Sequence, residues 1–155
     1  MSLESELRQE HVAHMDLSGF SSVPSGTSVR DVLSQLRTDG HNVCLVTDGN
    51  QLKGIFTDRD VLGKVVGSTQ TLDAPVDDVM TNSPITIKPD ASAADALRLM
   101  DENHFRNLPA VDENGTIVGD MTHLSVVNYL AARYPVEVLN LPPQPDRFPR
   151  KAEGG

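Results

Sequence analysis

The chain repeats itself, and this repeat constrains the fold more than any other feature of the sequence. Asp31 aligns with Asp95, 64 residues later, and Gly54 aligns with Gly119, 65 residues later. One extra residue in the second copy explains the change of offset, because a loop between strands is where an insertion is best tolerated. The chain therefore consists of two copies of one structural unit.

Within each copy the hydrophobic pattern changes in the same order. In the first copy, apolar residues recur at helical spacing between a capping residue, Ser28, and a helix-ending glycine, Gly40. Apolar segments on either side of a turn then predict a β-hairpin, and a second helix follows. The predicted elements are helices that open at Ser28 and Ser92, hairpin strands at 43–46 with 52–56 and at 107–111 with 116–121, helices from Thr57 to about Val66 and from near Thr122, and short extended segments at 20–23 and 84–87.

The repeated unit is therefore β-α-β-β-α, which places the chain in the α+β class. A lone unit of about 50 to 60 residues buries barely enough surface to be stable, so we expect the two units to pack sheet against sheet. The expected organisation is an N-terminal amphipathic segment at 1–15, repeat 1 at 16–72, repeat 2 at 76–134 and a proline-rich C-terminal tail at 135–155.

Composition excludes several classes of protein. Asp and Glu number 22 against 13 Lys and Arg, a net charge of −9 with no basic block, which argues against nucleic acid and anionic membranes as partners. No apolar run approaches the roughly 18 residues of a membrane span, the first residues do not form a signal peptide, and one cysteine cannot make an internal disulfide. We expect a cytoplasmic protein. No phosphate-binding glycine loop, nucleophile with a His partner or metal-ligand cluster is visible, so we expect no enzymatic activity.

Four short segments recur in order along the chain: GIFTDRD (54–60), DVMT (78–81), NLPAVD (107–112) and GDMT (119–122). Together they resemble the landmarks of the CBS domain, named after cystathionine β-synthase. This resemblance implies a pseudo-twofold pair of repeats, often called a Bateman module, with two clefts that bind adenosine-type ligands: AMP, ADP, ATP or S-adenosylmethionine. We expect no required cofactor.

The ligand signature of this family is matched in the first repeat by Gly54, Thr57 and Asp60. A carboxylate accepts hydrogen bonds from both ribose hydroxyls, whereas a threonine hydroxyl and free amides suit a phosphate, to which Arg59 and Lys64 add positive charge. The same Thr57 and Asp60 also form a capping box at the start of a helix, a stabilising role that needs no ligand. The two roles are compatible.

The second repeat departs from the signature. Gly119 and Thr122 stand at the matching positions, but Ser125 replaces the acid, and Asp120 occupies a position that is usually apolar in the family. A serine makes a weaker ribose contact than a carboxylate does, so we expect one strong site per chain.

The remaining candidates are isolated side chains. His123 is placed to meet a phosphate in the second cleft, with Arg106 reaching in from the hairpin. His11 and His14 lie one helical turn apart, but no third metal ligand is visible and a solvated helix face is favoured. Cys44 lies in an apolar strand and is expected in the core. We expect no metal site.

Two classes of function remain. The first is a regulatory module that senses an adenosine-type ligand and signals by conformational change to its own dimer or to a protein partner. The second is a scaffold whose clefts bind nothing and that serves for dimerisation or docking. In both cases we expect a homodimer, because the helices that end each repeat carry more apolar residues than one inner face needs.

Overall fold

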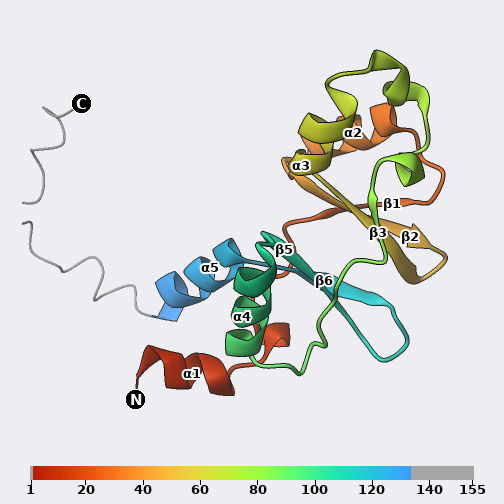
Figure 1. Cartoon of the computed structure of the whole chain (residues 1–155). Coiled ribbons are helices and arrows are strands. Elements are labelled where there is room, and N and C mark those ends of the chain that lie inside the picture. The colour runs from red at the N-terminus through yellow and green to blue at the C-terminus, as the bar shows by residue number, and fades with distance from the viewer. Residues whose placement is uncertain (1, 134–155) are drawn as a thin grey trace, which may run out of the picture.

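The computed structural model of the protein describes residues 2–133, and Figure 1 traces their path through two packed halves. The tail expected at 135–155 lies outside the described residues. The α-helices are α1 (Leu3–Gln9), α2 (Val29–Asp39), α3 (Asp58–Asp60), α4 (Ala93–Asn103) and α5 (His123–Arg133). The short helices η1 (Val12–His14), η3 (Thr69–Asp73) and η4 (Val76–Asp78) are 3₁₀ helices, and η2 (Val61–Val65) is a π-helix that continues α3 through the helix predicted from Thr57 to about Val66. The strands are β1 (Ser21–Pro24), β2 (Val43–Asp48), β3 (Gln51–Thr57), β4 (Thr81–Asn82), β5 (Asn107–Val111) and β6 (Ile117–Thr122). No helix within residues 2–133 is long and apolar enough to cross a bilayer.

The helices predicted to open at Ser28 and Ser92, α2 and α4, begin at the expected capping residues, and α2 also ends at the expected glycine. The hydroxyls of Ser28 and Ser92 accept the backbone amides three residues ahead at 3.1 and 3.0 Å, which satisfies one of the free amides at each helix start. Gly40 ends α2 in the left-handed conformation, with φ 73°. His104 ends α4 in the same conformation, with φ 56°, although it carries a side chain that disfavours it.

The strands form a four-stranded sheet in the order β1-β2-β3-β4 and a separate β5-β6 hairpin. Strand β1 runs parallel to β2, and the other pairs are antiparallel. The extended segment predicted at 84–87 makes only one ladder contact, between Ile87 and Ala110. Continuing this parallel ladder requires an amide at residue 109 to bond to Ile85, and Pro109 has none. The first strand of repeat 2 therefore separates from β5.

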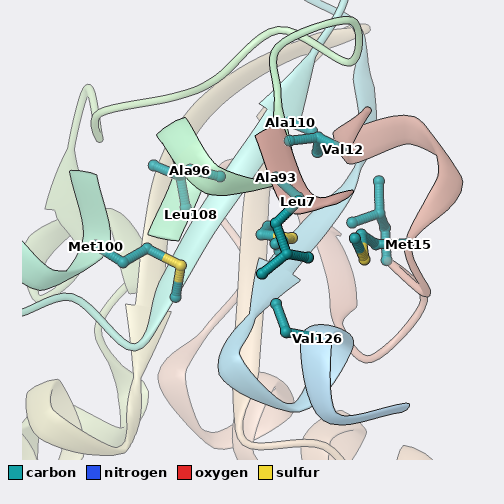
Figure 2. Close-up of a cluster of buried hydrophobic side chains, with 11 residues drawn as sticks. Leu7, Val12, Met15, Ala93, Ala96, Met100, Leu108, Ala110 and Val126 are labelled. Carbon is teal, nitrogen blue, oxygen red and sulfur yellow. The ribbon is translucent and has the colours of Figure 1, made fainter. Parts of the chain in front are cut away.

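Each repeat buries its core against the segment that precedes the other repeat. We call these segments, residues 10–17 and 74–81, the leading segments. Figure 2 shows side chains from α1 and the first leading segment meeting those of α4, β5 and α5. In the other half, Val76, Val79 and Met80 of the second leading segment complete the core of repeat 1.

Backbone hydrogen bonds fix both leading segments in equivalent ways. The amide of Val12 donates to Ala91 O at 2.9 Å, and the amide of Val76 donates to Thr27 O at 2.7 Å. Val76 is the repeat equivalent of Val12, and Ala91 is the repeat equivalent of Thr27, each 64 residues later. The structural repeat therefore extends back to about residue 10. Part of the 1–15 segment thus belongs to the repeated architecture and packs on repeat 2.

The repeats also meet through their sheets, as predicted. A buried cluster on the sheet face opposite the repeat 1 core joins residues of both halves. Its members are Val43, Leu45 and Ile55, with Phe20, Leu52 and Ile117 packed against them.

The leading segments approach the second hairpin strands so closely that glycine is needed there. A methyl group on Gly119 would clash with Leu17 Cβ and lie 2.7 Å from Leu17 O, both on a hydrogen-bonded segment. A methyl group on Gly54 would lie 2.5 Å from Met80 Sδ, near the end of a flexible side chain. We therefore expect Gly119→Ala to lower the free energy of unfolding by about 2–3 kcal/mol and Gly54→Ala by about 1 kcal/mol or less.

Urea denaturation of the two variants measures this difference. Gly63→Ala is the matched control, because a methyl group there meets no atom within 4 Å. Equal losses for Gly119→Ala and Gly54→Ala would contradict the rigid packing of Leu17.

Candidate functional site

A cavity of about 240 Å³ lies between the two repeats. On one side it is bounded by the end of β3 and by α3, and on the other by the chain leading into β4 and α4 and by the start of β5. The separation of residues 84–86 from β5, which Pro109 causes, leaves room at this place. The lining residues are Ile55 and residues 57–60, Thr81 and residues 83–85, and residues 104–107 with Pro109.

Asp60 is a buried carboxylate in the cavity wall, only 6% exposed. Its Oδ2 accepts the backbone amide of Thr57 at 3.0 Å, and its Oδ1 lies 3.1 Å from Lys64 Nζ. The capping role expected from the sequence is therefore present, and Lys64 balances the buried charge. Each carboxylate oxygen accepts more than one hydrogen bond, so Asp60 retains acceptor capacity toward the cavity.

Three basic side chains line the cavity: Arg59, His104 and Arg106. Arg106 Nη1 lies 3.4 Å from Asp58 Oδ2, which links repeat 2 to repeat 1 across the cavity mouth. The side chains are 77% and 49% exposed, and an exposed pair of this length contributes little stability. Arg106 is therefore available to an anion. We expected Arg106 with His123 in the second cleft, but it lines the cavity that also holds Thr57 and Asp60 of repeat 1.

The remaining wall is mainly apolar and was not predicted from the sequence. Ile85 and Phe105 line it together with Pro109. His104 also belongs to the residues that sequence reasoning missed, and it had left a signal. It stands at the position of Gly40 in the repeat, where a left-handed conformation favours glycine, so a histidine there is strained and points to function.

A polar pair joins the cavity wall to the interior of repeat 2: Asn107 lines the cavity, and Asp120 is buried behind it. Asp120 is 1% exposed, and its Oδ2 accepts a hydrogen bond from Asn107 Nδ2 at 2.7 Å. Its Oδ1 has no partner among the described residues. Burial raises the pKa of Asp120 to about 7, and the hydrogen bond from Asn107 opposes this shift.

Comparison with known proteins identifies the repeats. A sequence model of the CBS domain matches residues 16–67 and 76–132. The chain belongs to the CBS domain family. The CBS domain-containing protein CBSCBSPB3 of Arabidopsis thaliana is 38% identical over 112 residues, which cover 69% of this chain and 19% of the relative. The chain spans about a fifth of the length of this protein and of three similar Arabidopsis proteins.

Solved structures of CBS-pair proteins share the fold. CBSX2 from Arabidopsis thaliana is 28% identical, with a TM-score of 0.71, and the match covers 81% of this chain and 97% of CBSX2. A complex of CBSX2 with AMP is 29% identical, with a TM-score of 0.70 and coverage of 80% and 98%. The α+β fold with two CBS repeats is thus confirmed.

The CBS signature residues of the first repeat are brought together only in part. Thr57, Arg59 and Asp60 line the cavity with Arg106. Gly54 does not line it, since it lies against Met80 and allows β4 to pair with β3.

The CBS signature residues of the second repeat do not line this cavity. Ser125 Oγ accepts the Thr122 amide at 3.0 Å and donates to Asp16 O at 2.7 Å, so its hydroxyl holds the first leading segment. His123, which begins α5, is exposed and does not line the cavity that Arg106 lines, although it directly follows Thr122, the strand partner of Asn107. Phe20 packs on the buried cluster at the sheet interface, whereas Pro84, its equivalent in repeat 2, lines the cavity.

The other candidates have structural surroundings. Cys44 is fully buried, as expected, and burial raises its pKa to about 12. His11 stacks on His14, whose Nδ1 contacts Glu10. In the part of the chain described, no group of three or more His, Cys, Asp or Glu side chains is placed to hold a metal ion.

The raised pKa of Asp120 predicts a pH-dependent stability. The unfolded carboxyl titrates near 3.8 and the folded one near 7, so the folded state binds the extra proton between these values. Stability therefore falls as pH rises through this window, and the whole penalty is present above pH 7. We expect Asp120→Asn, which cannot ionise, to raise the free energy of unfolding at pH 8 by about 2–4 kcal/mol and to give no gain at pH 4.

Denaturant titrations at pH 4, 6 and 8 measure this effect. Asp31→Asn, at an exposed helix position, serves as the control and should change stability little at any pH. A gain from Asp120→Asn that is equal at pH 4 and pH 8 would show that ionisation of Asp120 is not the cause.

Proposed function

We propose that this CBS pair is a regulatory module that binds an adenosine-type ligand in the cavity between its repeats, with AMP as the first candidate. The observation that carries the proposal is the junction of two halves of a site. Thr57 and Asp60, two of the three signature residues of repeat 1, face an apolar wall and an arginine supplied by repeat 2. The structure of CBSX2 in complex with AMP, at 29% identity, supports the same ligand class.

Each part of AMP has a matching part of the cavity. The base fits between apolar side chains such as Ile85 and Phe105, and buried Asp60 accepts hydrogen bonds from the ribose hydroxyls. Arg59 and Arg106 suit the phosphate. Since Asp58 already pairs with Arg106, the positive charge at the mouth suits one phosphate better than three.

Binding in this cavity gives a route to a signal. The ligand contacts α3 of repeat 1 and the β5 end of repeat 2 at once, so it favours one relative placement of the repeats. The change is limited by the ligand's differential affinity for the two placements. This proposal involves no covalent chemistry: the residues that line the cavity only bind and orient the ligand.

The proposed ligand predicts a specific role for the Asp60 carboxylate. Asp60→Ser copies Ser125, which keeps the equivalent cap in the second repeat through the Thr122 amide. We therefore expect a folded variant that has lost the charged ribose contact. Its affinity for AMP should fall by about 10-fold to 100-fold, as expected for a hydrogen bond to a charged group.

Isothermal titration calorimetry with AMP measures the affinity. Asp31→Ser removes an acid at the matching helix position of α2, outside the cavity, and should bind AMP as the unchanged protein does. Unchanged affinity in a folded Asp60→Ser variant would disprove the ribose role. No binding of AMP, ADP, ATP or S-adenosylmethionine by the unchanged protein would favour the scaffold function.

We also propose that the module forms a homodimer. Large apolar side chains are exposed where each repeat ends, with Leu62 73%, Val66 67%, Leu124 62% and Val127 57% exposed. Leu62 and Val127 are equivalent residues of the two repeats, so the exposed apolar surface has the symmetry of the pair. Exposed apolar surface of this kind is usually covered by a partner.

The double variant Leu62→Lys, Val127→Lys tests the dimer. The unchanged protein at micromolar concentration should have a mass of twice 16.8 kDa by light scattering, and the variant 16.8 kDa. Leu3→Lys, at a 45% exposed position on α1, is the control and should remain dimeric. A monomeric unchanged protein would contradict the proposal.

A further inference from the structure

We propose that Asn107, held in place by the buried Asp120, reads the base of the bound ligand and selects a 6-amino purine over a 6-oxo purine. This inference rests on the proposed function and names a specificity determinant within the same cavity. Asn107 is the residue that contacts the base, and Asp120 is a positioning residue that acts through it.

The position of Asn107 places it against the base rather than the phosphate. Asn107 and Pro109 are two residues apart on β5, so their side chains share one face of the strand, and both line the cavity with Phe105, which precedes the strand. Asn107 thus lines the cavity together with the apolar Phe105 and Pro109 and with the basic Arg106. An amide beside apolar side chains meets the polar edge of a flat ligand and fixes its orientation.

The hydrogen bond to Asp120 decides which end of the Asn107 amide is free. Above pH 7, where Asp120 is ionised, its carboxylate only accepts, so the amide turns its Nδ2 to Asp120 Oδ2, at 2.7 Å. Among the described residues the only buried side-chain nitrogen or oxygen without a partner is Asp120 Oδ1. Asn107 Oδ1 makes no hydrogen bond within the described residues and is not among these buried atoms. Because Asn107 lines the cavity, this acceptor is available to a ligand there.

Packing does not explain an acid at position 120. The residue 65 positions earlier is Ile55, which fills the equivalent place in repeat 1 with an apolar side chain. A carboxyl group that is 1% exposed and has one oxygen unpaired lowers stability. A residue that breaks the local rule in this way points to a functional requirement, and the contact that Asp120 makes is with Asn107.

The free acceptor distinguishes two classes of purine. The 6-amino group of adenine donates a hydrogen bond to Asn107 Oδ1. Hypoxanthine and guanine carry an oxygen at this position, which would place two acceptors against each other and leave both unpaired. A site built around a hydrogen bond rejects the analogue that cannot make it.

Calorimetric titration at pH 8 with AMP and with IMP, which differ at the 6-position, tests the inference. We expect the unchanged protein to bind AMP at least about 10-fold more tightly than IMP. Asn107→Leu, similar in size but without an acceptor, should reduce this ratio to less than about threefold. Asn103→Leu, at an exposed asparagine outside the cavity, is the matched control and should keep the ratio.

The positioning role of Asp120 is tested by the same ratio. In Asp120→Val the Asn107 amide is no longer held, so discrimination between AMP and IMP should fall although Asn107 is present. A merely structural effect would weaken both nucleotides equally and keep the ratio, which would overturn the role of Asp120. If this variant does not fold, the ratio measured for Asn107→Leu decides the inference alone.

The outcomes separate this inference from the function on which it rests. Equal binding of AMP and IMP by the unchanged protein would overturn the inference and leave the adenosine-ligand site standing. Binding of neither would overturn both.

Discussion

The architecture depends on the reciprocal packing of the two leading segments. Residues 10–17 complete the core of repeat 2, and residues 74–81 complete the core of repeat 1. The equivalent backbone bonds made by Val12 and Val76 show that this is one interaction used twice. Neither repeat closes its core without the segment that precedes the other repeat, so the two repeats are held together through their hydrophobic cores. The packing of these segments therefore fixes the positions of the two repeats around the cavity. The ion pair between Asp58 and Arg106 at the cavity mouth is exposed and weak, so it contributes little to that arrangement.

Sequence differences at equivalent positions turn this near-symmetric scaffold into an asymmetric one. Pro109, which stands where repeat 1 has Leu45, stops the parallel ladder and separates the first strand of repeat 2 from β5, and the open cavity lies at that separation. In the other half, β1 pairs with β2 along its whole length, and Phe20 packs into the sheet interface. Ser125 uses its hydroxyl on the chain itself. Around β1 and at Ser125, backbone and side-chain groups of the chain bond to or pack on one another. At the cavity, the equivalent groups lack these internal contacts and remain available to a ligand.

Much of the fold was predictable because its signals are local. Serine caps, the glycine after α2 and the alternation of strand and helix periods depend on residues close in sequence, and the repeat confirmed each signal by a second copy. The predicted strand at 84–87 was the exception, because the missing amide belongs to Pro109 on another strand. Within the site, Thr57 and Asp60 were recognised by their resemblance to the CBS signature. Phe105 and Asn107 were not, since nothing in their neighbourhood along the chain marks them as facing another repeat.

The sequence by itself determined that the chain is a tandem α+β pair with one complete and one altered ligand signature, because repetition and short-range spacing are written in one dimension. Tertiary structure decided which side chains share a cavity. Arg106, expected in the second cleft, lines the cavity with Thr57 and Asp60. Part of the N-terminal segment lies in the core of repeat 2, and Asp120 is buried behind Asn107. These outcomes depend on contacts between residues far apart in sequence, and such contacts exist only once the two repeats have packed against each other.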